Sequence, residues 1–127
     1  MSLSQTARRI LEKTTPVYTA TLVDESDQPI TLASITTITL TLYDRQTGAI
    51  INTRTAQDIK NANQVTIHAT SGLLTWSMVS ADTAIQNADL PAESLEEHVA
   101  LFQWVLTSGK VGKYECSFDI VQVEKVS

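Results

Sequence analysis

Four stretches of this sequence alternate apolar and polar residues with a period of two, and each is rich in Thr, Val, Ile or aromatic residues. They are residues 38–42, 74–78, 102–106 and 114–120. Because successive side chains of a β-strand point to opposite faces, this pattern gives each segment one apolar and one polar face, as antiparallel sheets require. The pattern predicts an all-β protein.

Shorter alternating segments and turn signals occupy most of the remaining chain. Further strands are expected at 18–22, 30–32, 49–54 and 65–69, with turns rich in Asp, Gly and Ser at 24–29, 44–48, 71–72 and 108–112. Turn signals roughly every eight to twelve residues are typical of an immunoglobulin-like antiparallel β-sandwich of about seven to eight strands. A β-barrel is the alternative.

The apolar positions of the aromatic-rich strands predict the core. Cys116 is the only cysteine, so no intrachain disulfide can form. It alternates in phase with apolar neighbours, which favours a small buried hydrophobic residue over a reactive thiol. The expected core side chains are Trp76, Phe102, Trp104, Tyr114, Cys116 and Phe118.

The N-terminal segment has apolar residues at helical rather than strand spacing. Ala7, Ile10 and Leu11 follow Ser4 and Thr6, either of which could cap a helix. We predict a short amphipathic helix within an N-terminal arm at 1–14, followed by a sandwich domain at 15–127. Because so short a helix is marginal alone, its apolar stripe must contact its own domain or a neighbouring subunit.

Two strands carry apolar residues on both faces. Leu101 and Val105 oppose Phe102 and Trp104, and Val121 and Val123 fall out of phase with the strand before them. Such strands must be covered from outside the sheet, by the N-terminal helix or by another subunit. The candidate interface residues are Ala7, Ile10, Leu11, Leu101 and Val105.

Composition excludes several classes of partner. With 43% apolar and 18% charged residues, the 127-residue chain is globular rather than disordered. Its net charge of −5 repels the phosphate backbone, so we expect no nucleic-acid partner. No apolar run approaches the roughly 20 residues that span a bilayer, so we expect no membrane insertion.

Residues 80–97 form the most irregular and most acidic part of the sequence. Five carboxylates and no Lys or Arg occur there. We expect a solvated connection with short helical turns at 82–85 and 94–97. The spacing does not fit an EF-hand loop, and the adjacent Glu96 and Glu97 would point apart, which leaves no acid and base pair. We therefore expect no metal site here.

No residue cluster indicates catalysis. His68 and His98 lie outside zinc-ligand spacing and are expected on the surface. The serines lack a Gly-x-Ser-x-Gly context, and no glycine-rich phosphate loop occurs. We expect no enzymatic activity, no catalytic residue and no cofactor.

Two stretches resemble the small immunoglobulin-like structural proteins of tailed bacteriophages and prophages. The first runs from Asp-Glu-Ser-Asp-Gln-Pro-Ile-Thr-Leu at 24–32 to Leu-Tyr-Asp-Arg-Gln-Thr-Gly at 42–48, and is similar to the N-terminal sandwich of upper baseplate proteins. The second joins Trp-Ser-Met-Val-Ser-Ala-Asp-Thr at 76–83, Glu-Glu-His-Val-Ala-Leu-Phe at 96–102 and Gly-Lys-Val-Gly-Lys-Tyr-Glu at 109–115. It looks like a closing pattern of uncharacterised virion proteins. The N-terminal arm departs from the baseplate pattern.

The resemblance implies a non-enzymatic assembly component of a virion neck, tail or baseplate. Its expected partners are other virion proteins and further copies of itself, first in the host cytoplasm and then in the virion. The alternative is a ligand-binding module of the carbohydrate-binding or adhesin type that uses loops 55–63 and 80–97. Neither loop contains Trp, Tyr or Phe, the residues on which sugars commonly stack.

Overall fold

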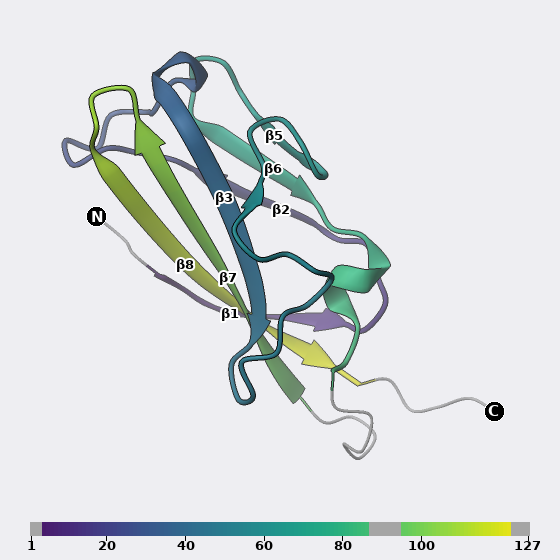
Figure 1. Ribbon diagram of the computed structural model, residues 1–127. Helices are drawn as coiled ribbons and strands as arrows, with labels where there is room; N and C mark the ends of the chain where they lie inside the picture. The colour runs from purple at the N-terminus through teal and green to yellow at the C-terminus, as the bar shows by residue number, and fades with distance from the viewer. Residues whose placement is uncertain (1–3, 87–94, 123–127) are drawn as a thin grey trace.

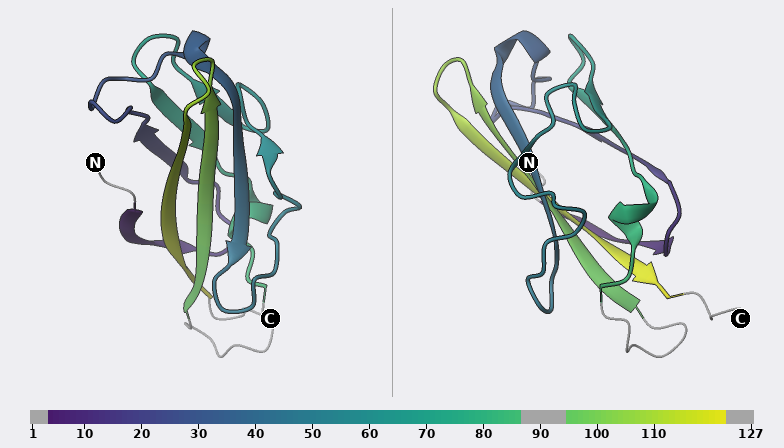
Figure 2. Two further views of the ribbon diagram at one scale, coloured as in Figure 1. Left: turned by 60° about the vertical axis from the view of Figure 1, so that its left-hand side comes forward. Right: turned by 45° about the vertical axis from the view of Figure 1, so that its right-hand side comes forward.

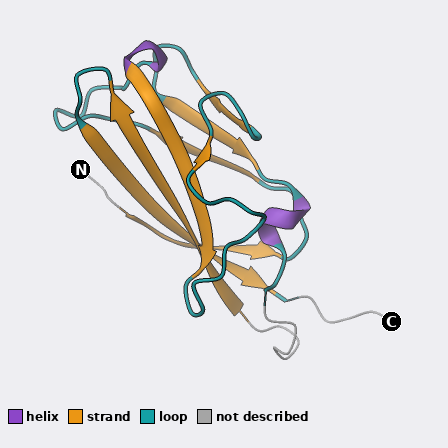
Figure 3. Ribbon diagram, viewed as in Figure 1, coloured by secondary structure: helices purple, strands orange, loops and turns teal. Residues whose placement is uncertain are grey.

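The computed structural model describes residues 4–86 and 95–122, with side chains from residue 9 onward, as two β-sheets (Figure 1). The larger sheet contains, in spatial order, β1 (Ser4–Leu11), β8 (Val111–Val121), β7 (Leu95–Leu106), β3 (Ile35–Asp44) and β4 (Gln57–Asp58). The smaller sheet contains β2 (Val17–Thr21), β6 (Leu73–Ser77) and β5 (Val65–Ile67). Two 3₁₀ turns, η1 (Leu32–Ser34) and η2 (Ser80–Thr83), are the only helical elements of the described residues (Figure 3).

The two sheets face one another and enclose the core (Figure 2). The four alternating stretches of the sequence coincide with β3, β6, β7 and β8, apart from Met78 just after β6. Their inward residues are buried because the period-two alternation puts every second side chain between the sheets. Trp76, Phe102, Trp104, Cys116 and Phe118 are at most 7% exposed, and Tyr114 packs partly buried against them.

Long antiparallel pairings hold the larger sheet together. β7 pairs with β3 from Ile35↔Leu106 to Asp44↔His98, and with β8 from Leu95↔Val121 to Val105↔Val111. The β7–β8 connection is the hairpin that its glycines predict. β1 instead runs parallel to β8, from Ser4↔Glu115 to Leu11↔Val121.

The predicted N-terminal helix is wrong, because residues 4–11 form strand β1. A helix of this length gains little by itself, whereas pairing with β8 satisfies backbone groups along one edge of the segment. Ile10 lies opposite Ile120 and is 6% exposed, whereas Leu11 is 55% exposed. Adjacent residues on opposite faces are the signature of a strand. Within the predicted arm, residues 4–11 are therefore part of the larger sheet rather than a separate helix.

Three other local predictions differ from the structure. The strand expected at 30–32 is absent, because Leu32 begins the 3₁₀ turn η1. The predicted helical turn at 94–97 is wrong for its described part, because Leu95, Glu96 and Glu97 begin β7. The predicted strand at 49–54 is reduced to a single bridge between Tyr43 and Ile50. The chain leaves the extended conformation at Asn52 and Thr53, where φ is +53° and +54°.

Candidate functional site

The candidate interface residues divide between the core and the outer face of the larger sheet. Ile10 is buried in the core, so it is not available to a partner. Leu11 is exposed, and Leu101 and Val105 are half-buried on the outer face of β7. The side chain of Ala7 and all of Val123 lie outside the described part. The N-terminal segment lies beside β8 at the sheet edge, so it does not cover Leu101 and Val105 as a helix would.

The register of the larger sheet places Leu11 beside two apolar residues that the sequence pattern did not predict to be its neighbours. Leu11 lies opposite Val121, which lies opposite Leu95. Directly paired residues point to the same face of a sheet, so these three form a row across β1, β8 and β7. Leu95 is 43% exposed. Val105 and Val111 are paired on the same face at the other end of these strands, where Val111 is 66% exposed.

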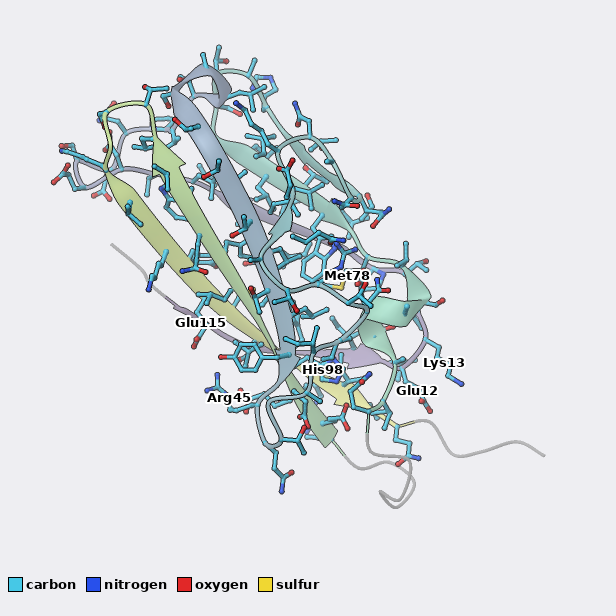
Figure 4. The ribbon with its side chains drawn as sticks, viewed as in Figure 1. Glu12, Lys13, Arg45, Met78, His98 and Glu115 are labelled. Atoms are coloured by element: carbon cyan, nitrogen blue, oxygen red, sulfur yellow. The ribbon has the colours of Figure 1, made fainter. Side chains whose placement is uncertain are left out.

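Charged residues separate the two apolar ends of this outer face. Arg45, just after β3, lies near Glu115 (Figure 4) and also contacts Glu97. Its Nε is 3.0 Å from Glu97 Oε2, and its Nη2 is 3.6 Å from Glu115 Oε1. These side chains are more than a third exposed, so each pair contributes at most about 1 kcal/mol to stability. Their main effect is to give the middle of the face a fixed pattern of charge.

A buried arginine joins the polar loop after β3 to η2. The Arg54 side chain is 1% exposed, and its Nε and Nη2 donate to the two carboxylate oxygens of Asp82 at 2.6 and 3.1 Å. Nη1 donates to Gln57 Oε1 at 2.6 Å and Nη2 to Gln64 Oε1 at 2.8 Å. The guanidinium carbon also lies 5.6 Å from the centroid of the Trp76 ring.

Both carboxylate oxygens of Asp82 accept a second hydrogen bond besides the one from Arg54. Asn52 Nδ2 donates to Oδ1 at 2.9 Å, and the Val79 amide donates to Oδ2 at 2.9 Å. This corrects the expectation of a solvated acidic connection, because Asp82 is only 2% exposed. Asp89 and Glu93 lie outside the described residues.

Glu96 and His98 form a second buried polar pair, on the inward face of β7. Their Oε1 and Nε2 atoms are 2.6 Å apart, and the Gln86 amide donates to the same Glu96 oxygen at 2.7 Å. The prediction of a surface His98 is wrong, because it is 1% exposed. Glu96 and Glu97 do point to opposite faces. His68 is exposed, and its Nδ1 accepts from the Ser71 amide at 3.1 Å within a turn.

Tyr18, Tyr114 and Cys116 form a cluster of weakly acidic groups between the sheets. The two tyrosine hydroxyls are 2.8 Å apart. Burial raises the pKa of the Cys116 thiol to about 12. Burial, followed by the proximity of Cys116, also raises the pKa of Tyr18. The thiol is therefore protonated and unreactive near neutral pH, as a structural cysteine is.

We expect this cluster to make stability fall in alkali. The unfolded thiol ionises near its ordinary pKa of 9.0 and the folded thiol near 12, so above pH 9 the unfolded chain binds fewer protons. Stability from the thiol is complete below pH 9 and is lost as pH rises toward 12, at up to about 1.4 kcal/mol per pH unit. Urea unfolding between pH 8 and 11 measures this slope. Cys116→Ala should make it shallower, and an unchanged slope in that variant would contradict the assignment.

The described residues contain no cluster of three or more His, Cys, Asp or Glu side chains that could hold a metal ion. The buried pairs Arg54–Asp82 and Glu96–His98 each join segments that are distant in the sequence or hold one strand to its neighbouring loop. No helix of the described residues has the length and apolar character needed to cross a bilayer.

Comparisons with protein-family models, with curated proteins and with solved structures give no match to this chain.

Proposed function

We propose that this protein is a non-enzymatic structural component of a phage or prophage virion, in the neck, tail or baseplate. It assembles through the outer face of its larger sheet, with copies of itself and with other virion proteins. The two sequence stretches that resemble phage structural proteins support the assignment to a virion. The exposed apolar residues on this face support the assembly mechanism.

Strand order supports an immunoglobulin-like architecture for this component. The sequence β8-β7-β3-β4 in the larger sheet corresponds to strands G, F, C and C′ of a variable-type sandwich. The smaller sheet, β2-β6-β5, corresponds to B, E and D. β1 adds an edge strand next to the last strand. Such sandwiches serve as rigid scaffolds whose outer surfaces carry the function.

The row formed by Leu11, Val121 and Leu95 is the observation that carries the proposal. It lies at one end of the outer face of the larger sheet, over which Figure 2 shows no other described element. A sheet face that is apolar at both ends and charged in the middle offers burial as well as an orientation for the partner. The charges of Arg45, Glu97 and Glu115 would restrict which neighbour fits.

We expect the full chain to form a defined oligomer and the double variant Leu11→Asp/Leu95→Asp to be a monomer of 13.9 kDa. Two carboxylates placed in the apolar row would have to be buried without partners in the assembly. Both positions are exposed in the single chain, so the fold should be retained. Light scattering behind a sizing column measures the mass.

Leu73→Asp is the matched control, because Leu73 is 40% exposed but belongs to the smaller sheet. Its mass should equal that of the unmodified chain. A full chain that stays monomeric at high concentration would contradict self-assembly. An oligomer that survives the double variant would contradict the assignment of the interface to this row.

A further inference from the structure

The outward side chains of β8 follow an order that complements itself when the strand is reversed. Cys116, which points inward, is the middle residue of this strand. Residues equally distant from it on either side are both apolar at the two ends, and are a base and an acid one step further in. From the hairpin to the end of the strand, the outward residues are Val111, Lys113, Glu115, Ser117, Asp119 and Val121.

The neighbouring strand β7 has the same kind of order about Ala100, which pairs with the middle residue of β8. Val105 and Leu95 are equally distant from Ala100, and both are apolar and outward. Gln103 and Glu97 are the next matched positions, and they combine an amide with a carboxylate. Directly paired residues share a face, so the two strands present one pattern together. The outer face is therefore complementary to a reversed copy of itself.

Two charges of this face have no ion partner among the described side chains of the single chain. Lys113 is exposed and Asp119 is half-buried, and neither forms an ion pair; Arg45 is the basic residue of this face that does. Arg9 lies beside Asp119 on β1 but forms no ion pair with it. Lys113 and Asp119 are six residues apart on one extended strand, about 20 Å, so they cannot meet within one chain.

We propose that two copies of this chain pack the outer faces of their larger sheets together with the strands antiparallel. The two-fold axis runs across the strands at Cys116 and Ala100. This pairing rests on the assembly function proposed above, and it specifies a second copy as the partner. Val111 then faces the second copy's Val121, and Lys113 faces its Asp119. Two-fold symmetry makes each of these contacts twice.

Charge favours the antiparallel arrangement over a parallel one. In a parallel two-fold arrangement about the β7–β8 boundary, each row of the face meets the same row of the second copy. Asp119 would then lie against the second copy's Glu97, and like charges in contact weaken binding. In the antiparallel arrangement, each of these carboxylates instead meets Lys113 or Gln103.

The face is large enough for a stable dimer. The antiparallel arrangement overlaps the whole of β8, because its two-fold axis passes through the middle of the strand. With 11 residues in β8 and with β1, β7 and β3 beside it, the face measures roughly 700 Å². This is close to the ~800 Å² that each partner buries in a typical stable complex. Figure 2 shows no other described element over this face.

Exchanging the two charges of β8 tests the arrangement, with dimer mass followed by light scattering over a dilution series. We expect the full chain to form a dimer of twice its 13.9 kDa mass. Lys113→Glu and Asp119→Lys should each raise the dimer dissociation constant by about tenfold or more, because each creates two repulsive contacts. Lys113→Glu/Asp119→Lys should return it to within about threefold of the original, because the exchanged charges attract again. Such a rescue requires two antiparallel copies.

Asp27→Lys is the matched control, because it makes the same charge change as Asp119→Lys in the exposed turn after β2. It should not weaken the dimer. Asp119→Lys also brings the net charge of −5 nearer to zero, so a general charge effect would strengthen the dimer instead. Circular dichroism checks that each variant keeps its fold.

The antiparallel arrangement is overturned if either single variant leaves the dimer unchanged, or if the combined variant stays dissociated. These results would leave the proposed function intact, provided that Leu11→Asp/Leu95→Asp still dissociates the oligomer. A full chain that is monomeric at high concentration would overturn self-assembly and this arrangement together. The two failures are therefore distinguishable.

Discussion

Replacing Asp82 by Ala should lower the free energy of unfolding by about 3–5 kcal/mol. The substitution leaves the Arg54 guanidinium buried at 1% exposure, with two of its N–H groups deprived of their carboxylate acceptors. It also removes the acceptor of Asn52 Nδ2 and of the Val79 amide. Urea unfolding followed by circular dichroism measures the change.

The double variant Arg54→Leu/Asp82→Leu separates the cost of an unpaired charge from the value of the pair. Removing both charges leaves no buried ion, so the double variant should lose less stability than Asp82→Ala alone. Asp58→Ala is the matched control, because Asp58 is exposed and loses only its hydrogen bond from the Lys60 amide, so its effect should stay within about 1 kcal/mol. An Asp82→Ala variant as stable as the control would show that Arg54 reaches water or another partner.

Sequence patterning did not predict this pair, for a physical reason. Arg54 and Asp82 are 28 residues apart, and neither has a neighbour that marks it as buried. Arg54 follows a polar turn, and Asp82 belongs to the acidic segment that composition alone describes as solvated. The two meet only because the chain turns at Asn52 and Thr53 and because η2 brings Asp82 to the same place. Side-chain periodicity does not encode such a long-range contact.

The strands themselves were predictable because their alternation is a local property. β3, β6, β7 and β8 each bury one face, and one-residue register shifts would expose the whole apolar set. The N-terminal strand was not predictable in the same way. The spacing of Ala7, Ile10 and Leu11 fits a helix. The segment is a strand because it pairs with the edge of β8. Tertiary pairing here overrides a weak local preference.

The candidate interface was predicted in part. The two apolar faces of β7 indicated that Leu101 and Val105 point away from the core, as they do in the structure. The row of Leu11, Val121 and Leu95 needed the register of three strands, which the sequence does not contain. Leu95 was missed because residues 94–97 have capping-box spacing, although Leu95–Glu97 extend β7.

We expect Trp76→Ala to cost about 3–5 kcal/mol of unfolding free energy, similar to the loss of Asp82. Trp76 is fully buried, and its ring centroid lies 6.4, 6.1 and 6.0 Å from those of Tyr18, Phe102 and Phe118. Truncation leaves a cavity between the sheets and removes these edge-to-face contacts. Trp76→Phe should cost less, since it keeps an aromatic ring there. Urea unfolding of both variants gives the difference.

Leu73→Ala on the same strand is the control, and its partly exposed side chain should make its effect smaller. Trp76 and Asp82 both contact Arg54, so their effects should not add. In the double variant Trp76→Ala/Asp82→Ala, the cavity left by the indole gives the guanidinium room to relax or to admit water, so the combined loss should be smaller than the sum. Strict additivity would mean that Arg54 does not couple η2 to the aromatic core.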